Sequence, residues 1–347
     1  MQRSAFLGGL SALTLAPRAA RAQLGTGDDA IRLKLVADEA QAVLAILARR
    51  AAGAAPDEAQ WNALFASEGY RRLAERERSF KRPFEDAAFR AFVSDPALLA
   101  RREQLAAALE AWSHADVAVC GRRALAYLPS GSRLHASVYP EIKPRTNSFV
   151  FDLEHDPGIF LYLDPGISAT VFTYTVAHEL HHVGFAQNCP TPEVRAQLER
   201  LPPRLKTFDN WLGAFGEGFA VLAGAGGADV DPATVVGAES IPEWKDERAT
   251  FAPRMAQLAA FFHDVLSGKL AGDAARDAGL AFFGTQGPWY TVGWRMAVTV
   301  ERRFGRNRLI ECIADNRLFL PAYNAAANGT DLPRWSDDLA RAFTRTT

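Results

Sequence analysis

The stretch "TVAHELHHVGF" gathers three histidines and a glutamate in an apolar setting. His178 and His182 are four positions apart, so on a helix both imidazoles project from one face and can reach the same ion. Glu179 lies beside them, in the place where the HExxH arrangement carries its general base. The stretch therefore predicts metal-assisted hydrolysis, provided that a third ligand lies elsewhere in the chain.

His181 is an alternative partner for His178, because it lies three positions further along the same helix. Pairing these two would leave Glu179 without the geometry that the motif normally gives it. We therefore expect His182 to be the ligand and His181 to be a supporting or packing residue.

Two familiar third ligands are excluded. The metzincin pattern requires glycine at position 185 and histidine at position 188, where this chain has Phe185 and Asn188. Zincins with an aspartate ligand carry GTxDxxY, and "GTQGPWY" has Gly287 at the aspartate position. A glutamate on a later helix remains.

Glu217 is the only charged residue in the apolar stretch "WLGAFGEGFAVLAGAGG". A lone carboxylate on a buried helix is costly unless it is protonated, paired or bound to a cation. We expect His178, His182 and Glu217 to hold one Zn²⁺ per chain, with the fourth tetrahedral position open for water. The neighbouring glycines at positions 213, 216 and 218 are predicted to let this helix press closely against the HExxH helix.

"HELHH" followed downstream by "EGFA" resembles the gluzincin metallopeptidases, and "GPWYTVGWRMAVTVERRFGRNRLIECI" is similar to the C-terminal part of uncharacterised zinc-dependent proteases of that clan. The resemblance covers roughly residues 145–325. It implies peptide-bond hydrolysis, with Glu179 activating water. It also points to Tyr290 as the donor to the oxyanion, while Tyr323 and Tyr174 compete for that role.

The elements that must position these residues are mostly helices. We expect a helical region over residues 23–115. A small mixed or antiparallel sheet and the HExxH helix should follow over 116–188, and a helical region over 189–347. The expected strands are among "VAVC", "LAYLPS", "LHASVYPEI", "NSFVFDL" and "IFLYLDP", the last two joined as a hairpin. The metal helix should start near Ile167. The predicted fold is α+β, predominantly α and zincin-like.

Residues 1–22 are typical of a cleavable signal peptide, with an apolar centre and small residues before Gln23. The sequence predicts export to the periplasm or medium, by either the Sec or the twin-arginine route. No other apolar run is long enough to span a bilayer. The formal net charge of -1 and the absence of long basic runs argue against nucleic acid as a partner.

Several alternatives stay open. The three cysteines, Cys120, Cys189 and Cys312, allow one disulfide or none, and buried thiols are the simplest expectation. The substrate is expected to be a peptide or protein, which pairs with an edge strand formed by "SFVFDL" or "IFLYLDP" and is cut in endopeptidase or exopeptidase mode. The competing hypothesis is a catalytically inactive, secreted zinc-binding or protein-interaction module.

Overall fold

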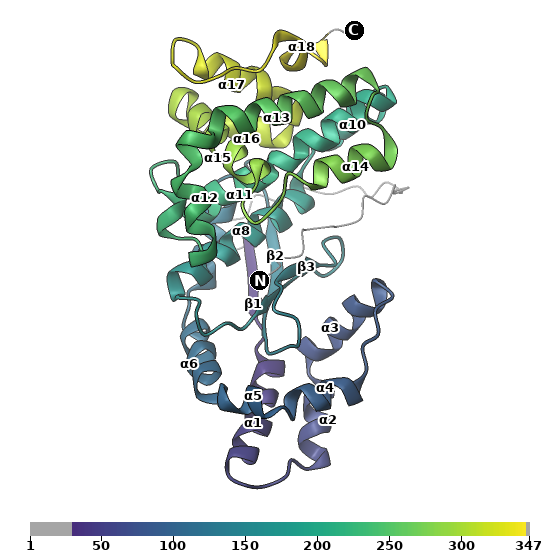
Figure 1. The fold of residues 1–347 in the computed structure, drawn as a ribbon, viewed down its shortest axis with the longest axis vertical. Coiled ribbons are helices and arrows are strands. Elements are labelled where there is room, and N and C mark those ends of the chain that lie inside the picture. Colours follow the sequence, from purple (N-terminus) through teal and green to yellow (C-terminus); the bar gives the residue numbers. More distant parts are fainter. Residues whose placement is uncertain (1–29, 345–347) are drawn as a thin grey trace. The chain divides into compact units, whose positions relative to one another are not determined.

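The computed structural model describes residues 30–344. The chain forms two compact units. Within the described residues, one unit comprises residues 30–118 and 135–176, and the other comprises residues 119–134 and 177–344. The described residues are predominantly helical with one small mixed sheet, so the α+β class is confirmed (Figure 1). The predicted signal peptide, residues 1–22, lies outside the described residues.

The sheet belongs to the first unit and has the strand order β1-β2-β4-β3. Its strands are β1 (Ile31–Leu35), β2 (Leu134–Glu141), β3 (Phe149–Phe151) and β4 (Gly158–Tyr162). β2 runs parallel to β4, with Ser137 opposite Gly158. β3 runs antiparallel to β4, with Phe149 opposite Phe160. The sheet is therefore mixed.

The connection from β3 to β4 confirms the predicted hairpin. Asp152 adopts a positive φ of 55° directly after β3, a conformation that aspartate tolerates better than most residues. On the sheet face, the Phe160 ring stacks on Tyr139 at 4.6 Å and on Phe149 at 5.0 Å between centroids. These cross-strand ring pairs set the register of three strands. The hydrogen bonding also shows that β3 is an edge strand and β4 is not.

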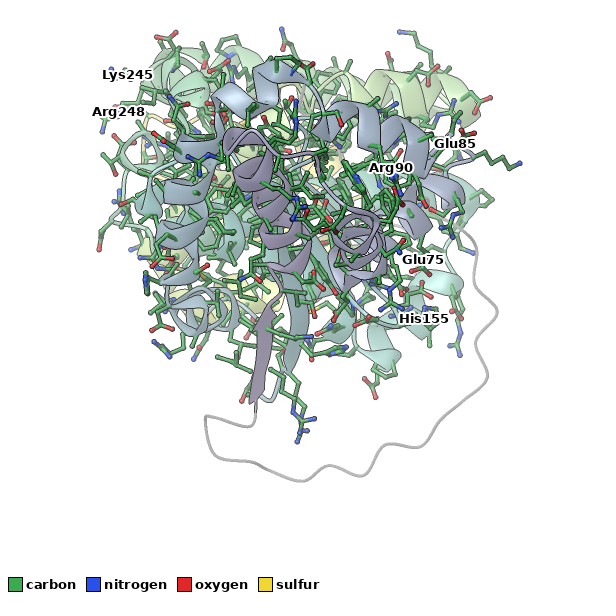
Figure 2. The ribbon with its side chains drawn as sticks, turned by 90° about the horizontal axis from the view of Figure 1, so that it is seen from below. Glu75, Glu85, Arg90, His155, Lys245 and Arg248 are labelled. Atoms are coloured by element: carbon green, nitrogen blue, oxygen red, sulfur yellow. The ribbon has the colours of Figure 1, made fainter. Side chains whose placement is uncertain are left out.

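Short helices make up most of the rest of the first unit, and α2, α3 and α5 begin at side-chain caps. Asp57 and Gln60 form a reciprocal capping box at the start of α2. Arg90, labelled in Figure 2, donates from both terminal nitrogens to Glu58 at 2.8 and 2.7 Å and ties α4 to α2. The helices are α1 (Asp38–Ala51), α2 (Glu58–Ala66), α3 (Glu68–Ser79), α4 (Asp86–Val93), α5 (Pro96–Ala100) and α6 (Arg102–Ser113).

Three local expectations were wrong. "IRLKL" is strand β1 inside a region expected to be helical, because its period-two alternation suits an edge strand. "LAYLPS", expected as a strand, is the end of helix α7 (Val117–Leu125) and the turn that follows it. "VAVC", also expected as a strand, is the start of the same helix. There the Asp116 carboxylate accepts a hydrogen bond from the Ala118 amide at 2.9 Å. Short apolar runs do not by themselves distinguish a strand from a buried helix.

The second unit is helical in its described part, as expected. Its centre is an aromatic core in which Phe208, Phe215, Phe262 and Trp289 are fully buried. The HExxH helix is α8 (Ala169–Asn188), close to its predicted start. The later helices include α9 (Pro192–Glu199), α10 (Pro203–Leu212), α11 (Gly216–Ala225), α12 (Ile241–Lys245), α13 (Glu247–Ser267), α14 (Gly272–Leu280), α15 (Pro288–Phe304), α16 (Arg306–Ala314), α17 (Phe319–Ala327) and α18 (Asp337–Ala340).

The side chains of Cys120, Cys189 and Cys312 are all buried, as the simplest of the cysteine expectations had it. Across residues 30–344, no helix combines the length and the apolar character needed to cross a membrane.

Candidate metal centre

Helix α8 presents the two histidines, and its C-terminal half is anchored by residues 119–134 of the same unit. A Cβ on Gly184 would lie 2.4 Å from Leu128 Cδ1, so only glycine lets this leucine pack so closely on the helix. Asn188 then donates to the Arg133 carbonyl at 2.8 Å and accepts from the Arg133 amide at 3.0 Å. The register of α8, and with it the direction of its imidazoles, is held by these contacts.

Helix α11 presents Glu217 from its first turn. The 3₁₀ turn Gly213–Phe215 leads directly into the helix, and every residue from Glu217 to Ala225 is buried. Gly226, in the left-handed conformation at φ 97°, ends the helix as its C-cap. The first turn of a helix favours an anion, so this is a good position for an ionised carboxylate.

The glycines around Glu217 have a different role from the one expected. A Cβ on Gly218 would lie 2.2 Å from the backbone carbon of Gly293, so the close approach is between α11 and α15. Gly216 has no such neighbour within 4 Å, and Gly213 meets only the Asn316 side chain at 3.3 Å. The prediction that these glycines press α11 against the HExxH helix was wrong. The crossing on α15 determines where α11 lies.

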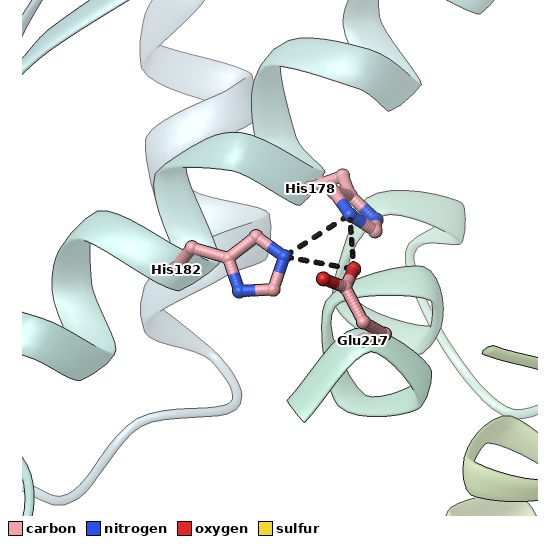
Figure 3. Close-up of side chains that lie close together, drawn as sticks. All are labelled: His178, His182 and Glu217. Atoms are coloured by element: carbon pink, nitrogen blue, oxygen red, sulfur yellow. Dashed lines mark hydrogen bonds and ion pairs between the residues drawn. The ribbon is translucent and has the colours of Figure 1, made fainter. Parts of the chain in front are cut away.

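His178, His182 and Glu217 converge on one point (Figure 3). The two imidazole Nε2 atoms are 3.2 Å apart. Oε2 of Glu217 lies 3.2 Å from Nε2 of His178 and 3.1 Å from Nε2 of His182. Among residues 30–344, this group brings together the three side chains that the sequence singled out as metal ligands.

These distances fit a zinc ion. Nitrogen and oxygen ligands at about 2.0–2.1 Å from a tetrahedral zinc lie about 3.3–3.4 Å from one another. The observed triangle, with sides of 3.1–3.2 Å, is close to that spacing. Two imidazole nitrogens and one carboxylate oxygen are also the donor set of catalytic zinc sites that leave one position open.

The electrostatics of the group favour an ionised carboxylate. Burial alone would raise the pKa of Glu217, which is 4% exposed. The positive charge of His182 and hydrogen bonds from both imidazoles outweigh this and hold the pKa well below its usual range. Conversely, burial would lower the pKa of His182, but Glu217 and the negative charge of Glu179 raise it. The group of His178, His182 and Glu217 therefore contains a negative charge on Glu217, which requires a positively charged partner.

His181 is not part of the group. It is 1% exposed, and burial together with the neighbouring histidines lowers its pKa to about 3. Its imidazole is therefore neutral and packs in the interior, in line with the expectation that His182 is the partner of His178.

Tyr290 lies beside the group. It sits in the first turn of α15, and its ring is stacked on His178 with 6.2 Å between centroids and 13° between planes. Tyr323, a competing candidate, is fully buried and donates to the Pro333 carbonyl at 2.8 Å. Tyr323 is thus a core residue with a satisfied hydroxyl, and Tyr174 belongs to the first unit.

Cys189 does not resemble a nucleophile. Burial raises the pKa of its thiol to about 12, so the thiolate is negligible near neutral pH. This agrees with the absence of a catalytic cysteine signature in the sequence.

The sequence reasoning did not find the partner of Gly218. Gly293 in "TVGW" is the complementary position, and its backbone is what Gly218 approaches. The sequence does have a glycine on each of the two apolar helices. The presence of these glycines does not predict, however, that the two helices pack against each other.

The comparisons with known proteins agree with the geometry. No curated protein and no solved structure matches the chain. One family model matches residues 61–331, which include all three converging side chains together with Glu179 and Tyr290. The chain belongs to this family, whose description is "putative zinc dependent peptidase (DUF5700)".

Proposed function

We propose that this protein is an exported zinc metallopeptidase of the gluzincin type, in which His178, His182 and Glu217 bind the metal. The observation that carries the proposal is the triangle of three donor atoms, 3.1–3.2 Å apart on two helices in the buried interior of the second unit. Membership of a zinc-dependent peptidase family supports a peptide or protein as the substrate.

In amide hydrolysis, the metal bound by the triangle, Glu179 and Tyr290 would each have a separate role. A bound zinc ion supplies a Lewis acid that acidifies water and polarises the scissile carbonyl. Glu179 is half-buried and directly follows His178 on α8, which supports its proposed role as the base that accepts the proton of the attacking water and passes it to the leaving amine. The Tyr290 phenol donates a hydrogen bond to the oxyanion.

Export follows from the N-terminal sequence. The apolar segment within residues 1–22, with small residues before Gln23, is proposed to direct the chain out of the cytoplasm and to be removed. Edman sequencing of the protein recovered from the periplasm or the medium should begin at Gln23. An intact N-terminus on the natural protein would contradict this part of the proposal.

Metal analysis combined with one conservative substitution tests the enzyme proposal. Wild-type protein from Gln23 onward should contain one zinc per chain and hydrolyse members of a peptide library with free and blocked termini. Glu179→Gln should keep the zinc and lose about 10²–10⁴-fold in kcat. The exposed Glu199→Gln on α9 is the matched control and should retain full activity.

The outcomes separate the proposal from its competitors. Full hydrolysis by zinc-loaded Glu179→Gln would remove Glu179 from the mechanism. Wild-type protein that binds zinc but cuts no peptide would instead support the inactive zinc-binding module. Protein that binds no zinc would contradict the metal centre itself.

A further inference from the structure

The backbone on both sides of Tyr290 is held by buried neighbours. Trp289, immediately before it, is fully buried and donates from Nε1 to the Gly279 carbonyl at 2.9 Å. Its ring also contacts Phe215 at 5.2 Å and Phe262 at 5.8 Å between centroids. The position of residue 289 is therefore determined by the aromatic core of the second unit.

Thr291, immediately after Tyr290, is 1% exposed and is held by an arginine from another helix. Arg254 on α13 donates from Nη1 to Thr291 Oγ1 at 3.0 Å and to the Gln286 carbonyl at 3.3 Å. The Thr291 hydroxyl in turn donates to the Gly287 carbonyl at 3.3 Å. A single guanidinium thus connects α13 to both the loop that leads into α15 and the first turn of that helix.

A second polar contact joins the same two helices further along α15. Arg295 on α15 lies 3.9 Å from the carboxylate of Glu247, which is 3% exposed on α13. This ion pair fixes the direction of α15, whereas the Arg254 contacts fix its beginning. The beginning is the part that carries Tyr290.

We propose that Arg254 is a positioning residue for the reaction, acting through Tyr290. It forms its hydrogen bonds with Thr291 and Gln286, which do not belong to the metal-binding triangle. Its effect is to hold the first turn of α15 so that the phenol stays beside His178. A donor to a developing charge must be held within about 0.5 Å of its productive position to be effective. The inference rests on the proposed function for its catalytic consequence.

Kinetics of substituted proteins test the inference. Arg254→Met removes both hydrogen bonds and should lower kcat by about tenfold to a hundredfold, with KM and zinc content unchanged. Arg254→Lys keeps one donor and should recover most of the rate. Thr291→Val should lower kcat as much as Arg254→Met does, whereas Thr291→Ser should keep the kcat of the wild type. Arg248→Met, on the exposed face of the same helix and labelled in Figure 2, is the control and should have no effect.

A double-mutant cycle distinguishes positioning from general damage to the fold. If Arg254 acts through the Tyr290 hydroxyl, Arg254→Met should cause no further loss of kcat in the Tyr290→Phe background. Equal losses in the wild-type and Tyr290→Phe backgrounds would overturn the inference.

A spectroscopic measurement tests the same contact without activity. We suggest placing 3-fluorotyrosine at position 290 in metal-free protein and recording its ¹⁹F resonance. Arg254→Met should shift or broaden this resonance, and a label at position 323 should be unaffected. An unchanged signal at position 290 would refute the positioning role. Absence of hydrolysis by the wild type would count against the proposed peptidase and leave this measurement to decide the role of Arg254.

Discussion

At the scale of single residues, Glu217 is the residue that distinguishes a candidate metal centre from a helix whose histidines only pack in the interior. Its carboxylate is buried among apolar side chains, and its direct ion-pair partners are His178 and His182. Removing one member of such a buried set leaves the others uncompensated. Removing any one of the three side chains should therefore lower the affinity for the metal.

Glu217→Gln should weaken zinc binding by at least about 100-fold, because a neutral amide replaces the one anionic ligand. Competition with a chelating dye would measure this affinity. Saturating zinc should raise the unfolding temperature of the wild type and not that of the variant. The exposed Glu193→Gln on α9 provides a control for the charge change alone. Undiminished affinity in Glu217→Gln would show that the third ligand is a different residue.

Tyr290→Phe should lower kcat by about 10²–10³-fold while KM and zinc content stay the same, because the hydroxyl acts only on the developing charge. Tyr323→Phe is the matched control. Its hydroxyl donates to the Pro333 carbonyl in the core, so its loss should cost about 1 kcal/mol of stability and leave kcat intact. The opposite pattern would transfer the oxyanion role to Tyr323.

At the scale of elements, the metal centre depends on the crossing of α11 and α15. The point of contact is Gly218 against the Gly293 backbone, and no side chain fits between them. Glu217 is adjacent to this contact on α11, and Tyr290 is three positions before Gly293 on α15. One helix crossing therefore positions both the proposed metal ligand Glu217 and the proposed oxyanion donor Tyr290.

Gly218→Ala should separate the two helices, since its Cβ would lie 2.2 Å from backbone atoms that cannot move away cheaply. We expect a loss of about 1–3 kcal/mol in the free energy of unfolding, together with weaker zinc binding. Gly216→Ala, two positions earlier with open space around it, should instead be neutral or stabilising by up to about 1 kcal/mol. Denaturant titrations with and without zinc would measure both effects. Equal changes in the free energy of unfolding in Gly218→Ala and Gly216→Ala would contradict the proposal that the crossing of α11 and α15 positions Glu217.

At the scale of the whole molecule, the first unit contains two buried carboxyl groups, Glu39 and Glu141, that make its stability depend on pH. Glu39 and Glu141 are 1% and 0% exposed. Burial raises the pKa of Glu39 to about 8, against an ordinary value of 4.5. Burial, reinforced by the negative charge of Glu39, also raises the pKa of Glu141 well above its ordinary value. Glu39 accepts a hydrogen bond from the Ile142 amide at 3.0 Å, but neither Glu141 oxygen has a hydrogen-bond partner among the described residues.

The sign of the resulting pH dependence follows from the direction of these shifts. A carboxyl whose pKa is raised by folding stabilises the fold below its ordinary pKa, and this contribution is lost as the pH rises through the folded value. The first unit should therefore become less stable between about pH 5 and pH 8. Glu141→Gln should reduce that loss by about 1–3 kcal/mol, because the amide does not ionise.

Urea unfolding at pH 5 and pH 8, followed by a probe placed in the first unit, would check this expectation. Glu75→Gln, an exposed position on α3 labelled in Figure 2, is the control and should leave the pH dependence unchanged. A pH dependence that Glu141→Gln does not alter would show that another group is responsible.

The residues of the candidate metal centre could be predicted from local sequence patterns. The i, i+4 spacing of His178 and His182 is a property of one helix, and the isolation of Glu217 among apolar residues is visible without any contact map. The helical predominance and the hairpin of β3 and β4 also followed from local patterns.

Features that depend on contacts between distant segments could not be predicted from the sequence and became visible in the folded chain. The tertiary structure showed that Gly218 approaches Gly293 and not the HExxH helix, that Tyr290 stacks beside His178 while Tyr323 is in the core, and that β3 is the edge strand. It also resolved "VAVC" as helix and "IRLKL" as strand, where short runs fit both. The physical reason is the same in each case: periodicity records which face of an element is buried, whereas the identity of the neighbour depends on packing between segments far apart in the chain.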